Sequence, residues 1–168
     1  ACHRLDRATS GCLVMALDPD WVKHVVAGMQ SEDATKRYIA LVRGKMRGFE
    51  EPQPVDTPIK VKPGKIKEAL TYVQCIAASQ EPRCSLALAT PRTGRNHQVR
   101  RHLRDLNHPV IRDAVHGDSK CNKHWTAEWG LKRLALHCLS LDFPIPGEER
   151  LRVTAPIPED LAHVLRRM

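Results

Sequence analysis

The feature that most constrains the fold of this chain is a series of short apolar or alternating segments separated by turn residues. Segments of this length and pattern are typical of strands. Helical periodicity is confined to residues 19–30, 95–106 and 158–168. We therefore expect one α+β domain over residues 1–168, built on a mixed, mainly antiparallel sheet flanked by helices. The expected strands are 12–17, 36–43, 69–78, 84–90, 134–142 and 151–155, with a further short strand and turn at 108–116.

Two stretches between these segments carry loop signals. Residues 44–58 contain three prolines and mixed charge, so they are expected to form a loop. Residues 59–67 are rich in lysine and have Pro63 and Gly64 in the middle, which indicates a basic loop or an irregular hairpin.

The charge balance favours a polyanionic partner. Lysine and arginine outnumber aspartate and glutamate by 27 to 19, which gives a net charge of +8. A basic protein without such a partner has the same balance, but here five arginines gather between residues 92 and 104. The six cysteines lack a disulfide-like or zinc-site spacing, so free thiols and no metal are expected. No apolar run approaches the length of a membrane span. The protein is expected to be a monomer.

The stretch from His3 to Gly11 reads HRLDRATSG and holds a carboxylate between two guanidinium groups. On an extended backbone, Arg4 and Asp6 share one face because side chains alternate. Neighbouring positive charge favours the ionised carboxylate, which can act as a nucleophile or a base. The alternative for an isolated Arg-x-Asp is a surface salt bridge, so other parts of the chain must decide between the two.

Three separated segments together resemble the RluA-type pseudouridine synthases, which isomerise uridine in RNA. The segments are HRLDRATSG at 3–11, KRYIALVRG at 36–44 and RTGRNHQVRRHL at 92–103. HPVI at 108–111, HGD at 116–118 and GLKRLALH at 130–137 are similar to the tRNA pseudouridine synthase C branch of this family. The resemblance implies a bent sheet with a central RNA-binding cleft, a structured RNA as partner, and chemistry that needs no cofactor or metal.

The resemblance also implies roles for individual residues. Asp6 matches the family nucleophile, which attacks either C1′ of the ribose or C6 of the uracil. Tyr38 matches the active-site tyrosine, whose ring stacks on the uracil and whose hydroxyl lies in reach of C5. An unperturbed phenol is a poor base near neutral pH, so relayed or water-assisted proton transfer is an alternative. Arg100 matches the arginine that pairs with the catalytic carboxylate, and Arg4 resembles the arginine that fills the gap of the flipped nucleotide or contacts a phosphate.

Further residues are assigned to the cleft around this centre. Ile111 and Leu136 are expected to form apolar walls for the uracil, whereas His116 and His137 are expected to be structural. RNA contacts are expected from Arg4, Arg7, Arg95, His97, Gln98, Arg101 and Arg104.

The chain departs from the family pattern at two places. It begins two residues before the HRLD motif, whereas the family has a preceding segment, so we expect an N-terminally incomplete catalytic domain. Arg112 stands where the family more often has glycine in a His-Pro-x-x-Gly-Asp pattern, which bears on the local turn and on substrate fit. A cytoplasmic location is expected, or an organelle matrix if a targeting segment is missing.

Three functions fit these patterns to different degrees. The leading one is a synthase acting on a uridine in tRNA, and the same chemistry on ribosomal RNA is its nearest alternative. A catalytically silent RNA-binding or ribosome-assembly factor with this fold is the third. A helix-turn-helix around residues 95–106 is disfavoured because no partner helix has the required spacing.

Overall fold

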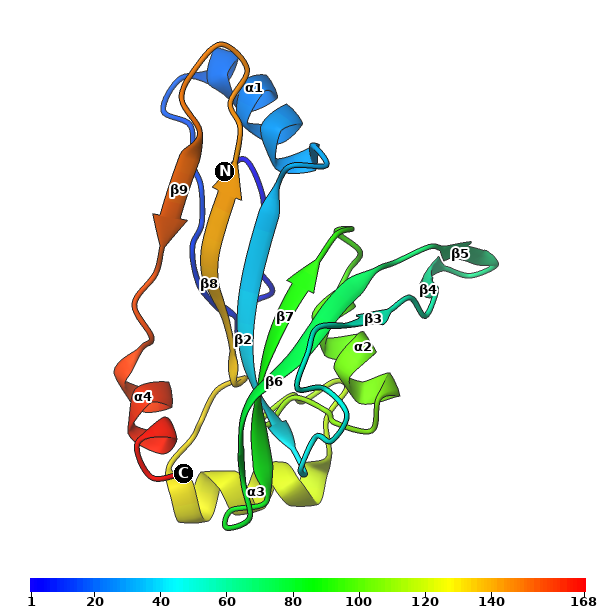
Figure 1. The fold of residues 1–168 in the computed structure, drawn as a ribbon, viewed down its shortest axis with the longest axis vertical. Coiled ribbons are helices and arrows are strands. Elements are labelled where there is room, and N and C mark those ends of the chain that lie inside the picture. The colour runs from blue at the N-terminus through cyan, green and yellow to red at the C-terminus, as the bar shows by residue number, and fades with distance from the viewer.

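A seven-stranded sheet forms the centre of the molecule in a computed structural model that describes residues 1–168 (Figure 1). Its strand order is β1-β8-β2-β7-β6-β3, and β9 pairs with β8. The β1–β8 pair is parallel and every other pair is antiparallel, which confirms the predicted mixed, mainly antiparallel α+β fold. The strands are β1 (Ser10–Gly11), β2 (Thr35–Arg43), β3 (Gln53–Val55), β6 (Thr71–Ser79), β7 (Cys84–Pro91), β8 (Leu136–Phe143) and β9 (Leu151–Thr154).

Strand β2 is the central strand of the core. It pairs with β7 on one side and β8 on the other, and its middle residues from Ile39 to Val42 are all buried in the main hydrophobic core. A strand covered on both faces reads as a continuous apolar run, as this one does. A second, smaller core packs Val25 and Met29 of the first helix against Leu141 and Phe143 of β8.

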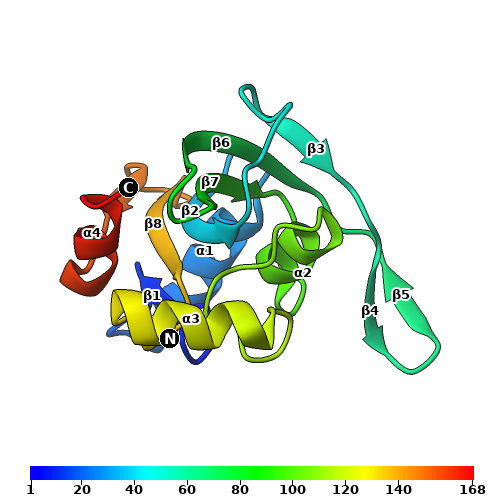
Figure 2. The ribbon, with the colours of Figure 1, turned by 90° about the horizontal axis from the view of Figure 1, so that it is seen from below.

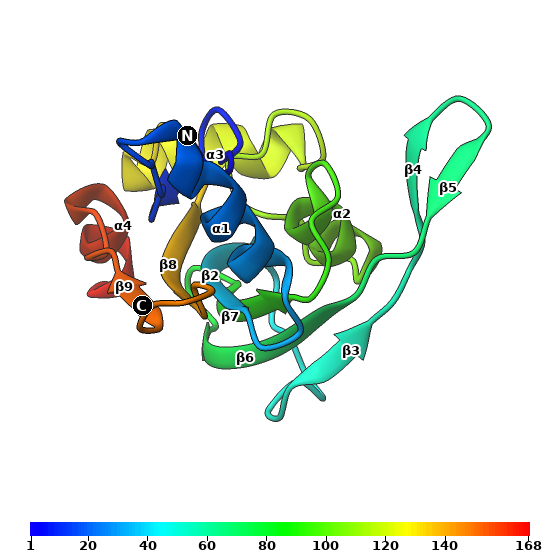
Figure 3. The same ribbon diagram turned by 90° about the horizontal axis from the view of Figure 1, so that it is seen from above.

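Four helices cover the sheet, and three of them lie on the same side of β2, β7 and β6 (Figures 2 and 3). Helix α1 (Pro19–Gln30) begins where the Asp18 carboxylate accepts a hydrogen bond from the Asp20 amide, and Pro19 occupies its first turn. Helices α2 (Gln98–Asp105) and α3 (Ser119–Trp129) follow on that side, whereas α4 (Glu159–Leu165) lies beyond β9.

The structure corrects several expected elements. Residues 12–17 form no strand, and the short strand β1 lies just before them. Leu13, Met15 and Leu17 are exposed, and no full ladder partner runs beside this segment. Residues 108–116 contribute only an isolated bridge between Val110 and Val42. Helix α2 begins at Gln98 rather than at residue 95, since residues 92–97 form a loop.

Besides the short strand β1, two elements were not predicted from the sequence. The predicted loop at 44–58 contains the edge strand β3, which includes Pro54. Helix α3 was not predicted, although Asp118 caps its first turn and Gly130 ends it in the left-handed region with φ of 66°.

The basic stretch after β3 forms a separate two-stranded hairpin that extends away from the sheet (Figures 1 and 3). It consists of β4 (Ile59–Lys62) and β5 (Lys65–Lys67), which confirms the hairpin alternative. Ile59 at its base is buried, whereas Ile66 near its tip is exposed. No helix of the molecule combines the length and apolar composition needed to cross a membrane.

Candidate active site

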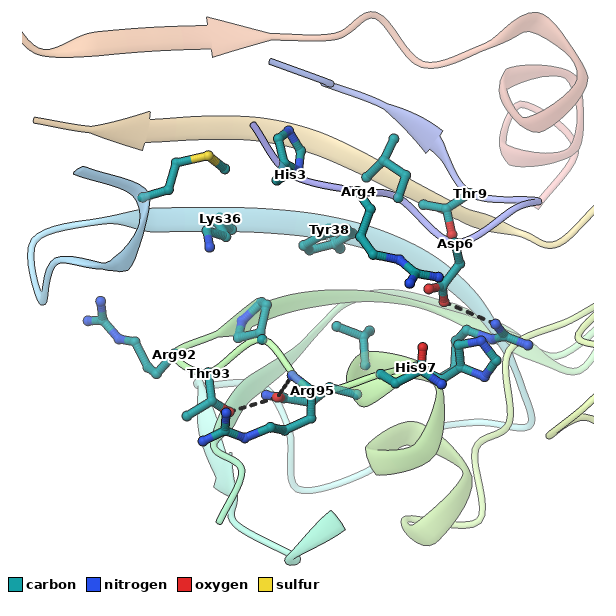
Figure 4. A pocket seen from close by; sticks show the side chains of 18 of the residues that line it. His3, Arg4, Asp6, Thr9, Lys36, Tyr38, Arg92, Thr93, Arg95 and His97 are labelled. Carbon is teal, nitrogen blue, oxygen red and sulfur yellow. Dashed lines mark hydrogen bonds and ion pairs between the residues drawn. The ribbon is translucent and has the colours of Figure 1, made fainter. Parts of the chain in front are cut away.

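One cavity of about 760 Å³ opens between the N-terminal segment, β2, the end of α1 and the start of α2 (Figure 4). Its volume falls within the roughly 300–1,000 Å³ range of small-ligand sites. The N-terminal segment contributes His3 to Asp6, β2 contributes Lys36 and Tyr38, and the end of β7 with the loop before α2 contributes residues 91–97. The three segments that carry the sequence motifs therefore meet at one cavity.

Arg100 joins two carboxylates at one end of this cavity. Its Nη1 atom donates to Oδ2 of Asp6 at 3.0 Å, while its Nε and Nη2 atoms donate to the two carboxylate oxygens of Asp113 at 2.7 and 2.8 Å. The Asp113 side chain is fully buried, Arg100 is 7% exposed and Asp6 is 20% exposed. The guanidinium is thus held rigidly from behind and presents one edge to the carboxylate that faces the cavity.

Hydrogen bonds keep the buried pair charged. Burial alone would raise the pKa of Asp113, but bonds from Arg100 and from the amides of His116 and Val115 bring that pKa below its usual value. Burial alone would lower the pKa of Arg100, yet its bonds to Asp113 and Asp6 raise it. The resulting arrangement keeps a guanidinium in place beside Asp6.

A tight turn sets Asp6 at the cavity wall. The Thr9 amide donates to the Asp6 carbonyl at 2.8 Å, and β1 then docks beside β8. Gly11 has φ of 117°, and a side chain there would lie 2.1 Å from the Cys138 carbonyl oxygen. The glycine of the TSG sequence is therefore required for the close approach that anchors the Asp6 turn.

Tyr38 lines the cavity from β2, where the register with β8 shifts between Arg37 and Tyr38. Burial first, and then the Cys138 thiol and the Asp6 carboxylate, raise the pKa of Tyr38 far above its ordinary range. The phenol is therefore neutral at physiological pH. Its ring is available for stacking, whereas direct proton removal by a phenolate is disfavoured.

The loop before α2 is fastened by Gln98. Its side-chain oxygen accepts from the Thr93 hydroxyl at 2.7 Å and from the Arg95 amide at 3.0 Å. Its side-chain nitrogen donates to the Leu70 carbonyl and the Thr71 hydroxyl. The Gln98 amide is thus occupied by the protein, which differs from its expected role as an RNA contact.

His97 lies at the Asp6 end of the cavity in the left-handed region, with φ of 54°. Its Nδ1 atom lies 2.9 Å from Nε2 of His116, so one of the two rings donates to the other. His116 also donates its amide to Asp113. His116 consequently acts as a support that fixes the ring of His97 at the wall.

Arg112, at the position of a family glycine, retains the turn that places Asp113. Its φ is 64°, a value that glycine adopts more readily. The Arg112 amide donates to the Asn122 side chain at 2.7 Å, and the guanidinium reaches the carbonyls of Asn122 and Lys132. These bonds hold the arginine in the strained conformation.

The structure brings most, but not all, of the predicted residues to the cavity. Ile111 is 1% exposed and packs in the main core, away from the cavity lining. Arg7 and Arg104 are exposed outside the lining, and Arg101 donates to the Lys60 carbonyl of the β4–β5 hairpin. Those that line it are Arg4, Asp6, Tyr38, Arg95, His97, Gln98, Arg100 and Leu136.

Two site residues were missed. Asp113 is the acid of the His-Pro-x-x-Gly-Asp pattern, but its contact with Arg100 depends on the turn at Arg112. Lys36 stands two residues before Tyr38 on the same face of β2, and strand alternation alone could have placed it in the cleft. No group of three or more histidine, cysteine or acidic side chains is arranged to hold a metal ion.

Bacterial proteins of known family are similar to this chain over most of its length. The tRNA pseudouridine synthase C of Pasteurella multocida is 35% identical over 94% of this chain and 72% of its own length. The protein of the same name from Haemophilus ducreyi is 34% identical over 86% of this chain and 66% of its own length. The ribosomal large subunit pseudouridine synthase C of Vibrio vulnificus is 33% identical over 98% of this chain and 53% of its own length. The chain thus spans about two thirds of the length of the tRNA-named relatives.

Two solved human structures share the fold. Human RNA pseudouridylate synthase domain containing 4 superimposes with a TM-score of 0.80 over 99% of this chain and 74% of its own, at 25% identity. Human RNA pseudouridylate synthase domain containing 1 gives a TM-score of 0.78 over 94% of this chain and 68% of its own, at 27% identity. Residues 1–105 also match the sequence model described as RNA pseudouridylate synthase, and with relatives of this similarity the chain belongs to that family.

Proposed function

We propose that this protein is an RNA pseudouridine synthase that isomerises a specific uridine in tRNA. The observation that carries the proposal is the Asp6–Arg100 ion pair of 3.0 Å at the wall of a nucleoside-sized cavity that Tyr38 also lines. A cavity-facing carboxylate beside a buried guanidinium suits an ionised nucleophile better than a surface salt bridge.

The reaction conserves all atoms of the nucleotide. The Asp6 carboxylate attacks either C1′ of the ribose or C6 of the uracil, and the N1–C1′ bond breaks. The uracil turns and C5 bonds to C1′. The bond between Asp6 and the attacked carbon then breaks, which regenerates the carboxylate, while the C5 proton leaves and N1 gains a proton. No electrons enter or leave, so the residues must supply a nucleophile, an orientation and a path for one proton.

Arg100 orients the nucleophile, and Asp113 orients Arg100. With three of its nitrogens bound to carboxylate oxygens, the guanidinium has little freedom to turn. A fixed attack geometry can lower the activation barrier by about several kcal/mol. Lysine at position 100 would keep the charge and lose the fork that contacts both carboxylates.

Tyr38 provides a surface for the displaced uracil. Because burial raises the pKa of its phenol, the C5 proton leaves through a relay or a water molecule that the hydroxyl positions, rather than to a phenolate. Leu136 lines the same cavity and offers an apolar contact to the base.

Arg4 serves the nucleotide that must leave its strand. It lies beside Asp6 on the cavity wall and is exposed (Figure 4). Flipping a nucleotide costs a few kcal/mol, and a planar cation that enters the gap offsets part of this cost. A phosphate contact is the alternative role for Arg4.

The relatives favour tRNA as the substrate, since the chain covers 66% and 72% of two relatives named tRNA pseudouridine synthase C, but 53% of the one named for the ribosomal large subunit. Ribosomal RNA is the second candidate, because a relative named for the ribosomal large subunit is 33% identical. Mapping pseudouridines in total RNA from cells with and without this gene separates the two.

The test of the chemistry is the Asp6→Asn variant. It is expected to retain RNA affinity and to lose isomerisation by on the order of 10⁴-fold or more, because an amide cannot replace the attacking carboxylate. Pseudouridine formation by this variant at the wild-type rate would disprove the assignment of the nucleophile. A wild-type protein that binds RNA and changes no uridine would instead be a silent RNA-binding factor.

A further inference from the structure

The cavity extends well beyond the Asp6–Arg100 pair. Figure 4 shows Lys36 and Arg92 at the opposite end from Asp6 and His97. This end is formed by the last turn of α1, the start of β2 and the first residues after β7. A smaller hollow of about 330 Å³ adjoins it, because Gln30, Ser31, Ala34 and Arg92 line both.

Lys36 is a cation without a carboxylate partner. It is half-buried at the cavity wall, makes no ion pair, and has its pKa lowered by that burial. The nearby ring of His3 does not compensate its charge, since Nε2 of His3 accepts from the Val14 amide. A partly desolvated ammonium without a counter-charge favours an anionic ligand.

Arg92 adds a second uncompensated charge. Its Nη1 atom donates only to the backbone carbonyls of Glu32 and Ala34, at 3.5 and 3.4 Å. Glu32 lines the smaller hollow but forms no ion pair with either cation. The two cations therefore share this end of the cavity with neutral groups such as Gln30 and Ser31.

We propose that Lys36 and Arg92 form a binding subsite for a phosphodiester of the RNA strand next to the target uridine. The inference rests on the proposed function and extends it to a neighbouring nucleotide. A phosphate fits better than a base, because no tryptophan, phenylalanine or second tyrosine lines this end for stacking. Lysine acts on phosphate as a point charge, and the arginine fork adds directed donors.

The geometry of β2 gives the subsite its place along the strand. Lys36 and Tyr38 lie two residues apart, so both side chains project from the same face of β2. A uracil stacked on Tyr38 therefore has its own or an adjacent phosphate within reach of Lys36. The subsite is accordingly assigned to the phosphates flanking the flipped nucleotide.

Binding of a labelled twelve-nucleotide oligouridylate as a function of salt tests the proposal. The Asp6→Asn protein provides a background without turnover. In that background, Lys36→Gln is expected to weaken binding roughly tenfold at low salt. It should also lower the slope of log affinity against log salt by about 0.7, the value for one phosphate contact on a single strand. Arg92→Gln is expected to act in the same direction.

A charge-matched control is Lys123→Gln, since Lys123 is exposed on α3 and does not line the cavity. It is expected to leave affinity and slope unchanged, whereas Lys36→Arg is expected to restore most of both. An unchanged salt slope in Lys36→Gln overturns the proposal, even if the affinity is weaker, because Lys36 would then act through packing.

A second measurement locates the phosphate on a substrate RNA found by pseudouridine mapping. Each phosphate within two nucleotides of the target is replaced in turn by an uncharged methylphosphonate. At one position the replacement should weaken RNA binding by the wild-type protein about tenfold and cause no further loss of binding in Lys36→Gln. Additive losses at every position would exclude a direct contact. The binding measurement stands even if no uridine is isomerised, so failure of the subsite and failure of the proposed function remain distinguishable.

Discussion

The two ends of the cavity treat charge in opposite ways. At one end, Arg100 is enclosed by Asp6 and Asp113, and all three side chains are mostly buried. At the other end, Lys36 has no carboxylate partner and Arg92 reaches only backbone carbonyls. The first end is complete before any ligand arrives, whereas the second leaves positive charge available.

This difference separates orientation from binding. A compensated network holds its geometry and offers little free energy to a ligand, since its groups are already satisfied. Uncompensated cations cost stability in the free protein and regain it when an anion binds. Four variants test this contrast, in order of decreasing expected effect.

Removal of the buried acid has the largest expected effect. Asp113→Ala leaves the Arg100 guanidinium buried with a single carboxylate and should lower the free energy of unfolding by about 3–5 kcal/mol. Chemical denaturation measures the loss. Asp105→Ala is the matched control, because it removes an exposed Arg104–Asp105 pair that contributes at most about 1 kcal/mol. Equal losses in the two variants would remove the contrast between a buried network and a surface pair.

Exchange of the guanidinium is the next test. Arg100→Lys keeps one positive charge but cannot contact Asp6 and Asp113 together, so single-turnover isomerisation is expected to fall about 10²-fold. RNA affinity and its salt slope should stay within twofold of the wild type. If affinity and rate fell equally and the slope decreased, Arg100 would be a phosphate contact like the one proposed for Lys36.

Removal of the unpaired Lys36 ammonium should stabilise the protein, whereas removal of the Asp113 carboxylate destabilises it. Burial lowers the pKa of Lys36, so the unfolded chain binds its proton more readily than the folded one. Wherever the pH lies below both pKa values, the folded state carries the full cost of the charge. Lys36→Met is therefore expected to stabilise the protein by roughly 0.5 kcal/mol at pH 7. The gain should vanish above pH about 10.4, the unfolded value for lysine.

Thermal unfolding at pH 7 and at alkaline pH checks this sign, and the same variant must bind RNA more weakly. Lys123→Met serves as the control, because its exposed ammonium loses little hydration on folding. Destabilisation by Lys36→Met at neutral pH would show that packing of the lysine stem stabilises the fold by more than burial of its charge destabilises it.

The smallest effect is expected at Arg112. Glycine relieves a φ of 64° that costs an ordinary residue about 1–2 kcal/mol, but it loses the bonds to Asn122 and Lys132. Because the two effects oppose each other, the net change in unfolding free energy should stay below about 0.5 kcal/mol. Arg112→Ala keeps the strain and loses the same bonds, so denaturation should show it to be less stable than Arg112→Gly.

Sequence patterns predicted the elements whose apolar period repeats over a full strand or helix. Strand β2 and helix α1 are examples, because burial of one face or both leaves a readable pattern. The same reasoning failed at 12–17, where Leu13, Met15 and Leu17 suggest burial but have no partner to cover them. Whether an apolar segment is covered depends on neighbours that its own residues do not encode.

Site residues that belong to a sequence motif could be predicted. Residues that reach the site only because the fold brings distant segments together could not. Asp6, Tyr38 and Arg100 were found from their motifs and line one cavity. Asp113 lies thirteen residues after Arg100, and the chain turns through left-handed residues at Asn107 and Arg112 before the carboxylate meets the guanidinium. Ile111 shows the converse, because its neighbours in sequence suggest a pocket wall while its own side chain packs into the core.

The β4–β5 hairpin is joined to the rest of the molecule mainly at its base, where Ile59 is buried and the Lys60 carbonyl accepts from Arg101. Its outer half projects away from the sheet and the helices (Figures 1 and 3), so insertions, deletions or exchanges of lysine there are expected to leave the Asp6 carboxylate undisturbed. The β4–β5 hairpin can therefore change in evolution independently of the Asp6 site. A hairpin from a relative could be exchanged for it without changes to the residues around Asp6.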